Sequence, residues 1–117
     1  MITLADVIDA IEKNGLTKIQ GQYIKYDDTG MVPLAGCALG QAAINLGFVY
    51  PDGNPYWSDG RYPYTPDTLH GLLWNAGSFT SRVFELNDTT AYTLPEIAEV
   101  LRTEYEDFLN VVIKEDD

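Results

Sequence analysis

Cysteine and histidine are scarce in this sequence, and their scarcity excludes several kinds of site. Cys37 is the only cysteine among 117 residues, so the chain can form no internal disulfide, which fits a reducing compartment. With His70 as the only histidine, a zinc site would need carboxylate help. No segment has the spacing of a calcium loop or the glycine pattern of a phosphate-binding loop. We therefore expect no metal and no cofactor.

Basic residues are also few, and they are dispersed along the chain. Seven lysines and arginines stand against eighteen aspartates and glutamates, which gives a formal net charge of −11. Such a charge repels a phosphate backbone unless a basic patch is segregated from it. Direct nucleic-acid binding is thus disfavoured, and a protein with a basic surface is the partner expected to be attracted.

Long apolar runs are missing, so the sequence predicts no membrane-spanning segment and no membrane partner. The first residues lack the basic start and apolar core of a signal peptide, because Asp6 and Asp9 interrupt them. We expect a cytoplasmic protein. The length and the apolar content of 45% predict one compact acidic domain over residues 1–117.

The residue patterns predict an α+β fold, in which a small antiparallel sheet of two to four strands packs against a long C-terminal helix and two or three shorter helices. Helices are expected over 4–14, 36–46 and 67–74, and strands over 16–26 and 81–86. Thr3 is the expected cap of the first helix, and Gly47 is placed to end the second.

The C-terminal helix is predicted to start at Thr93-Leu94-Pro95-Glu96, which has capping-box spacing. An apolar stripe then extends over about five turns and comprises Ile97, Leu101, Tyr105, Phe108 and Val112. Residues 96–117 hold eight acids and two bases, a net charge of −6. The expected partner-binding acids of this helix are Glu96, Glu99, Glu106 and Asp107. Such carboxylates are ordinarily just solvated, and they could also imitate the phosphates of a nucleic acid.

A tyrosine- and proline-rich stretch at about 48–67 predicts a long shaped loop. Its aromatic residues are Tyr50, Tyr56, Trp57, Tyr62 and Tyr64. Tyrosine and tryptophan are favoured in binding loops because they offer large contact area with little side-chain entropy to lose. A recognition surface and a lid over the core are equally compatible with this composition.

Cys37, at a predicted helix start, could form a nucleophile, base and orienter set with His70 and Asp88. The alanines around Cys37 favour burial as a small apolar residue instead. The Asx residues near Asn87 and Asp88 are typical of turns and caps.

Two motifs resemble an uncharacterised family of small proteins from tailed phages and bacterial genomes. The motifs are a helix start, Cys37-Ala38-Leu39-Gly40, and Phe84-Glu85-Leu86-Asn87-Asp88, an Asn-Asp turn before the terminal helix at Thr93-Leu94-Pro95. The aromatic insert at 50–67 and Ala91-Tyr92 depart from the family pattern. The resemblance implies a phage or mobile-element origin and no established activity.

The prediction is a non-enzymatic, phage-derived acidic protein that acts in the host cytosol, binds a host protein and could inhibit it. Counter-defence and mimicry of nucleic acid fall within this hypothesis. A small Cys/His hydrolase or transferase is one alternative, and a carbohydrate or small-ligand binder that uses the aromatic loop is another. A homodimer through the aromatic residues also fits the sequence.

Overall fold

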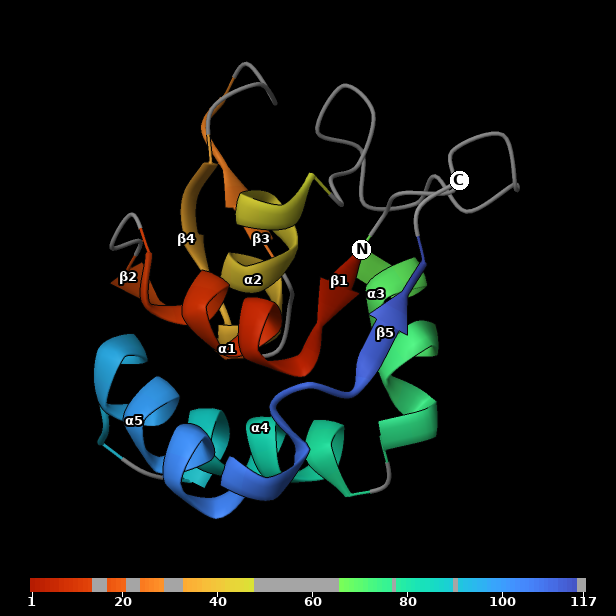
Figure 1. The fold of residues 1–117 in the computed structure, drawn as a ribbon. Helices are drawn as coiled ribbons and strands as arrows, with labels where there is room; N and C mark the ends of the chain where they lie inside the picture. Colours follow the sequence, from red (N-terminus) through yellow and green to blue (C-terminus); the bar gives the residue numbers. More distant parts are fainter. Residues whose placement is uncertain are drawn as a thin grey trace.

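The computed structural model describes residues 1–13, 17–20, 24–28, 33–47, 66–76, 78–89 and 91–115 (Figure 1). The α-helices are α1 (Leu4–Glu12), α2 (Ala38–Leu46), α3 (Pro66–Leu73), α4 (Phe79–Thr89) and α5 (Leu94–Glu104). In these ranges the 3-10 helices are η2 (Trp74–Ala76) and η3 (Glu106–Phe108). The strands are β1 (Ile2–Thr3), β2 (Thr17–Lys18), β3 (Ile24–Tyr26), β4 (Pro33–Gly36) and β5 (Val112–Lys114). The predicted α+β class is confirmed.

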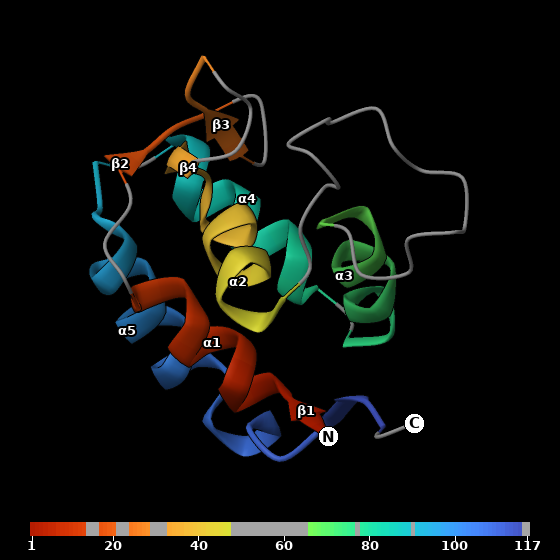
Figure 2. The ribbon, with the colours of Figure 1, turned by 90° about the horizontal axis from the view of Figure 1, so that it is seen from above.

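Helix α1 packs between α2 and α5 (Figures 1 and 2). Its start has the predicted cap, in which the Thr3 hydroxyl accepts from the Asp6 amide and the Asp6 carboxylate accepts from the Thr3 amide at 2.8 Å. Apolar residues spaced three and four apart fill the contact with both neighbours, so α1 lies at the centre of the core. These buried residues are Leu4, Val7, Ile8, Ala10 and Ile11.

Helix α2 is built from small residues and packs closely against α1. Ala38, Ala42 and Ala43 are fully buried, as the predicted burial of this helix requires. The helix ends where expected, because Gly47 adopts a left-handed conformation with φ of 87° that favours glycine.

Two amide side chains of α2 complete the end of α1. Asn45 Nδ2 donates to the carbonyl oxygens of Ala10 and Lys13, both at 2.7 Å, and buried Gln41 also donates to Lys13 O. Carbonyls at a helix C-terminus have no partner within the helix. Polar side chains of α2 therefore donate hydrogen bonds to the C-terminal carbonyls of α1. The two helices are joined by these hydrogen bonds as well as by apolar contact.

The strands form two small sheets. Strand β1 pairs antiparallel with β5, which joins the two ends of the described chain. The second sheet has the order β2-β4-β3, with β2 parallel and β3 antiparallel to β4. The single strand predicted over 16–26 is thus represented by two strands, which lie on opposite sides of β4.

The strand predicted over 81–86 is wrong, because this segment belongs to α4. The residues that α4 buries recur at spacings of three and four, and they are Phe79, Thr80, Val83, Leu86 and Asn87. A helical period therefore outweighed the β-propensity of the short Val83-Phe84 pair.

The C-terminal helix is shorter than predicted. Thr93 and Glu96 form the expected capping box, but α5 ends at Glu104, and the chain passes through η3 into β5. The five-turn apolar stripe is therefore wrong beyond Tyr105. Phe108 and Val112, assigned to it from the sequence, are 54% and 40% exposed.

Asn87 joins α4 to two other elements from a fully buried position. Its Oδ1 accepts from the Ala38 amide at 2.9 Å, and its Nδ2 donates to Ile19 O at 2.9 Å and Asp88 Oδ1 at 3.0 Å. One of the unpaired amides at the start of α2 is satisfied in this way. The Cys-Ala-Leu-Gly and Asn-Asp motifs, far apart in sequence, thus meet in space, although Asn87 and Asp88 lie in the last turn of α4 and do not form the predicted turn after it.

Candidate functional site

The four acids expected to bind a partner are all exposed, but their carboxylates differ in the hydrogen bonds that they accept. The Glu96 carboxylate accepts from the Thr93 amide at 3.0 Å, and this hydrogen bond holds the pKa of Glu96 below its ordinary value. Glu99 accepts from Arg102 at 3.2 Å. No hydrogen bond or ion pair joins the side chain of Glu106 or Asp107 to any other described residue. These last two carboxylates are the most available to a partner.

Arg102 ties the exposed faces of α1 and α5 together. Its guanidinium donates to Asp9 at 2.9 Å and to Glu12 at 2.8 Å, in addition to Glu99 on its own helix. These hydrogen bonds, the one to Asp9 foremost, raise the pKa of Arg102, so it remains charged. Three carboxylates share one cation, and the cluster keeps a negative net charge.

Arg82 plays the same part between α4 and α5. It makes a two-pronged contact with Glu104, in which Nη2 lies 2.8 Å from Oε2 and Nε lies 2.9 Å from Oε1, and it also bonds Glu85. The hydrogen bond from Arg82 lowers the pKa of Glu104. Because carboxylates of the chain contact both arginines, a phosphate group would have to compete with those carboxylates. Glu99 and Glu104 are likewise partly neutralised, which weakens the idea of a phosphate-like array along α5.

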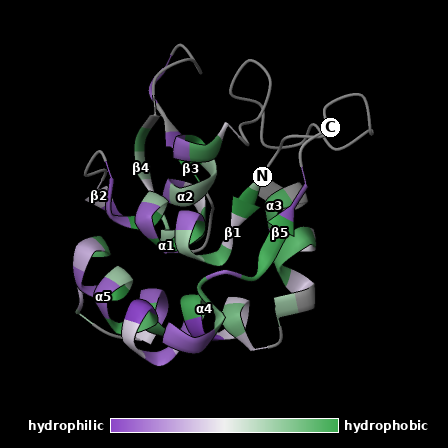
Figure 3. Cartoon of the chain, in the orientation of Figure 1, coloured by the Kyte–Doolittle hydropathy of each residue, from purple (hydrophilic) through white to green (hydrophobic). Residues whose placement is uncertain are grey.

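An exposed apolar surface follows directly after the two unpaired carboxylates. We call Glu106, Asp107, Phe108, Val111 and Val112 the C-terminal patch. Phe108 is 54% exposed, and Val111 and Val112 are each 40% exposed. The Val111 amide donates to Phe108 O at 3.0 Å, so the backbone turns between these two residues. In Figure 3 the hydrophilic turn that follows α5 leads directly into the hydrophobic strand β5.

The backbone of the C-terminal patch is anchored to the N-terminus of the chain. The Leu4 amide donates to Val111 O at 2.9 Å, the Ala5 amide donates to Leu109 O at 3.0 Å, and Thr3 pairs with Val112. The next residue, Ile113, is buried in the core. The patch is therefore presented on a fixed backbone, and a partner that binds it need not order this segment.

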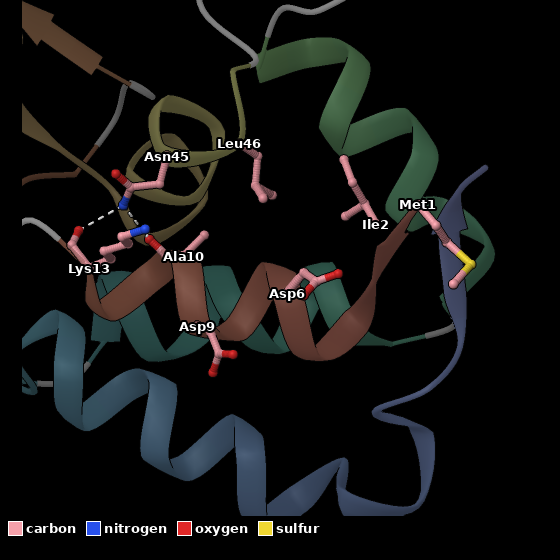
Figure 4. Close-up of a pocket in the computed structure, with 8 residues that line it drawn as sticks. All are labelled: Met1, Ile2, Asp6, Asp9, Ala10, Lys13, Asn45 and Leu46. Carbon is pink, nitrogen blue, oxygen red and sulfur yellow. Dashed lines mark hydrogen bonds between the residues drawn. The ribbon is translucent and has the colours of Figure 1, made fainter. Parts of the chain in front are cut away.

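A groove of about 350 Å³ lies between the start of α1 and the end of α2 (Figure 4). It is lined by Met1, Ile2, Asp6, Asp9, Ala10, Lys13, Asn45 and Leu46. Figure 4 shows Leu46 extending from α2 toward α1, with Asp6 and Ile2 beyond it and Asp9 directed away toward α5. Its volume is at the lower end of the range for small-molecule pockets, and its lining combines apolar side chains with both signs of charge.

The alternative catalytic residues come from three helices. Cys37 is 4% exposed, caps α2 and has its Sγ bonded to the Gly40 amide. Burial raises the pKa of the Cys37 thiol, and the negative charge of Asp88 lies close enough to help raise it, so the unreactive thiol form prevails at neutral pH. His70 on α3 packs edge-on against Phe84 at a ring distance of 5.4 Å. Asp88 is exposed, and its Oδ1 accepts from the Asn87 side-chain Nδ2 at 3.0 Å. The predicted burial of Cys37 is confirmed, and this arrangement does not favour a thiolate nucleophile.

The aromatic loop residues Tyr50, Tyr56, Trp57, Tyr62 and Tyr64 lie outside the described residues. Within the described part of the chain, no three His, Cys, Asp or Glu side chains converge as metal ligands would. No helix in the same ranges has both the length and the apolarity to cross a bilayer.

The chain was also compared with known protein families, curated proteins and solved structures. None of these comparisons produced a match.

Sequence reasoning missed both the exposure of the C-terminal patch and the groove. A signal for the patch was present in Val111-Val112-Ile113, since three successive β-branched residues favour a strand over a helix. The groove depends on the distance between α1 and α2, and no local pattern in either helix predicts the distance between the two.

Proposed function

We propose that this chain is a non-enzymatic interaction protein that binds a host protein carrying a basic surface with an apolar centre, and that it inhibits that protein. The C-terminal patch is the observation that supports the proposal. Aromatic and aliphatic side chains at the centre of an interface supply most of its affinity, and charged groups at its rim select the partner. Phe108, Val111 and Val112 supply the first element, and Glu106 and Asp107 supply the second.

The charge of the chain favours a basic partner over a second copy of itself. At a net charge of −11, two copies repel each other at long range, whereas a basic protein is steered toward the carboxylates. In a symmetric dimer through the patch, Glu106 and Asp107 would be brought close to their own copies. Such a contact would hold like charges together, which is destabilising.

The phage origin rests on the Cys37-Ala38-Leu39-Gly40 and Asn87-Asp88 motifs and remains part of the proposal. It makes a bacterial host protein, including a nucleic-acid-binding protein of a defence system, the expected target. Such proteins carry basic surfaces, so a carboxylate surface could cover the site at which they bind nucleic acid.

Affinity capture from a bacterial host lysate tests the proposal, with the wild type, Phe108→Gln, and the double variant Tyr56→Ala, Trp57→Ala as baits. Trp74→Gln is the matched control, because Trp74 is an even more exposed aromatic residue on a different element, at 74%. The same protein should be retained by the wild type and by Trp74→Gln, should be lost with Phe108→Gln, and should be released as salt is raised.

Two results would count against the proposal in different ways. If the partner is lost with the Tyr56, Trp57 variant and kept by Phe108→Gln, the binding surface is the aromatic loop and the patch is wrongly assigned. If the wild type retains nothing at low salt, the interaction function itself is wrong.

A further inference from the structure

The groove beside α1 is lined in part by apolar side chains. Leu46 forms one wall, and Ile2 and the exposed Met1 line the other end. Ala10 lies on α1 near Asn45, at the opposite end from Met1, and is almost fully buried. A methylene chain could pack on Leu46 and Ile2 without breaking the two hydrogen bonds that the Asn45 side-chain amide donates to Ala10 O and Lys13 O.

One carboxylate oxygen of Asp6 is still free to bind a ligand at this groove. Asp6 Oδ2 accepts from the Thr3 amide at 2.8 Å and from the Thr3 hydroxyl at 3.1 Å. Asp6 Oδ1 accepts no hydrogen bond from any described residue. Because Oδ2 is held by the cap, the carboxylate has a fixed direction, and binding at Oδ1 costs little side-chain entropy.

The charges along the groove give it a direction. Asp6 lies near one end and Lys13 near the other, and their Cα atoms are about 10 Å apart at a rise of about 1.5 Å per residue. The Asp9 side chain is directed away from the groove toward α5, where its Oδ1 accepts from Arg102 at 2.9 Å. Asp6 therefore attracts a cation and Lys13 repels it, while the net charge of −11 of the whole chain disfavours an anion at the groove.

We propose that this groove binds one lysine or arginine side chain of a protein partner, with its methylene stem on Leu46 and Ile2 and its charged head on Asp6 Oδ1. Lysine and arginine match this lining because they combine an apolar stem with a cationic tip. A second copy of the chain is a poor occupant, since its few basic side chains would have to approach through a surface of like charge.

This inference rests on the proposed function, because it takes the partner to be a basic protein. The groove would be a second binding surface, on a different face of α1 from the face that Arg102 connects to α5. Since the groove shares no side chain with the C-terminal patch, each surface can be removed by mutation without touching the other.

NMR titration tests the groove with a defined probe. The full-length, ¹⁵N-labelled protein is titrated with an acetylated, amidated pentapeptide that has arginine at its centre and alanine elsewhere. The matched probe replaces the arginine with citrulline, which keeps the shape and most of the hydrogen bonds and removes the charge. We expect the arginine peptide to shift the amide signals of Asp6, Ala10 and Leu46, and the citrulline peptide to bind about two- to fivefold more weakly.

Two protein variants separate the charge from the stem. Asp6→Asn keeps an oxygen that can accept from Thr3 and so retains the helix cap, while it removes the carboxylate; it should weaken the arginine peptide about two- to fivefold. Leu46→Ala should weaken the arginine and citrulline peptides alike, because both share the stem. Asp28→Asn removes one exposed carboxylate outside the groove and should leave binding unchanged.

The inference is overturned if millimolar arginine peptide shifts no groove signals, or if the citrulline peptide binds as tightly as the arginine peptide. Neither result depends on the C-terminal patch, which is tested separately by Phe108→Gln. A failure of the groove and a failure of the proposed function are therefore distinguishable.

Discussion

Replacement of Asn87 by leucine, which is similar in size, should be among the most destabilising single changes in this chain. The leucine side chain can occupy much of the same space, but it leaves the Ala38 amide and the Ile19 carbonyl without their partner. A buried polar group that loses its hydrogen bond costs about 1 to 3 kcal/mol. The Ala38 amide is deeply buried and Ile19 is partly exposed, so we expect a total loss of about 2 to 4 kcal/mol.

Urea unfolding followed by circular dichroism measures this loss as a lower midpoint at an unchanged slope. For a domain with a stability of about 5 to 15 kcal/mol, a loss of this size is readily detected. Asp88→Asn is the control, because it keeps an oxygen to accept from Asn87 and should change stability by less than about 0.5 kcal/mol. If Asn87→Leu unfolds at the wild-type midpoint, Asn87 does not join α4 to α2 in the way described.

Three further outcomes are expected from the capping, ion-pair and thiol geometry. Thr93→Ala should lower the free energy of unfolding by about 1 kcal/mol, as measured by thermal unfolding, because it removes the cap of α5. Thr103→Ala, at an exposed site in the same helix, should have little effect. Equal effects of the two changes would contradict the cap. The Glu104 carboxylate should titrate in NMR below its unfolded pKa of about 4.3 and return toward it in Arg82→Gln. The lowered folded pKa means that Glu104 stabilises the fold above the unfolded pKa, and that this contribution is lost as pH falls through the folded value. Cys37 should react with a thiol reagent far more slowly in the native protein than in urea, and equal rates would show that Cys37 is accessible.

The elements that sequence reasoning located correctly are those with strong local signals. Thr3 and Thr93 each have an acid three residues later, and both capping boxes are present in the structure. Gly47 ends α2 because it can adopt a positive φ that most other residues resist. In these places the information lies within a few residues of the feature.

The errors occurred where tertiary contacts decided between two local preferences. Residues 81–86 contain β-branched and aromatic side chains, yet the core selects the helical spacing of Phe79, Val83 and Leu86. The spacing of Phe108 and Val112 extends the helical pattern of α5, but the helix ends earlier and the chain forms β5, which pairs with β1. That pairing joins residues more than a hundred positions apart, so a local pattern could not reveal it.

The candidate site could be predicted only in part for the same reason. Exposure of Glu96 and Glu99 was predicted correctly from helical periodicity and charge, whereas Glu106 and Asp107 are exposed in η3, beyond the end of α5. The sequence could not show that Arg102 would hold Glu99 while Glu106 and Asp107 have no partner among the described residues. That distinction requires the positions of α1 and α5 relative to each other.

Site-specific photocrosslinking in host cells tests the central claim most directly. A photoreactive phenylalanine analogue is placed at position 108 in one variant and at position 74 in another, so that two exposed aromatic sites are compared. The proposed function predicts that the residue at 108 crosslinks to one specific host protein, and that the residue at 74 does not. If position 108 forms no crosslink, or crosslinks only to a second copy of the chain, the C-terminal patch is not the surface that binds a host protein.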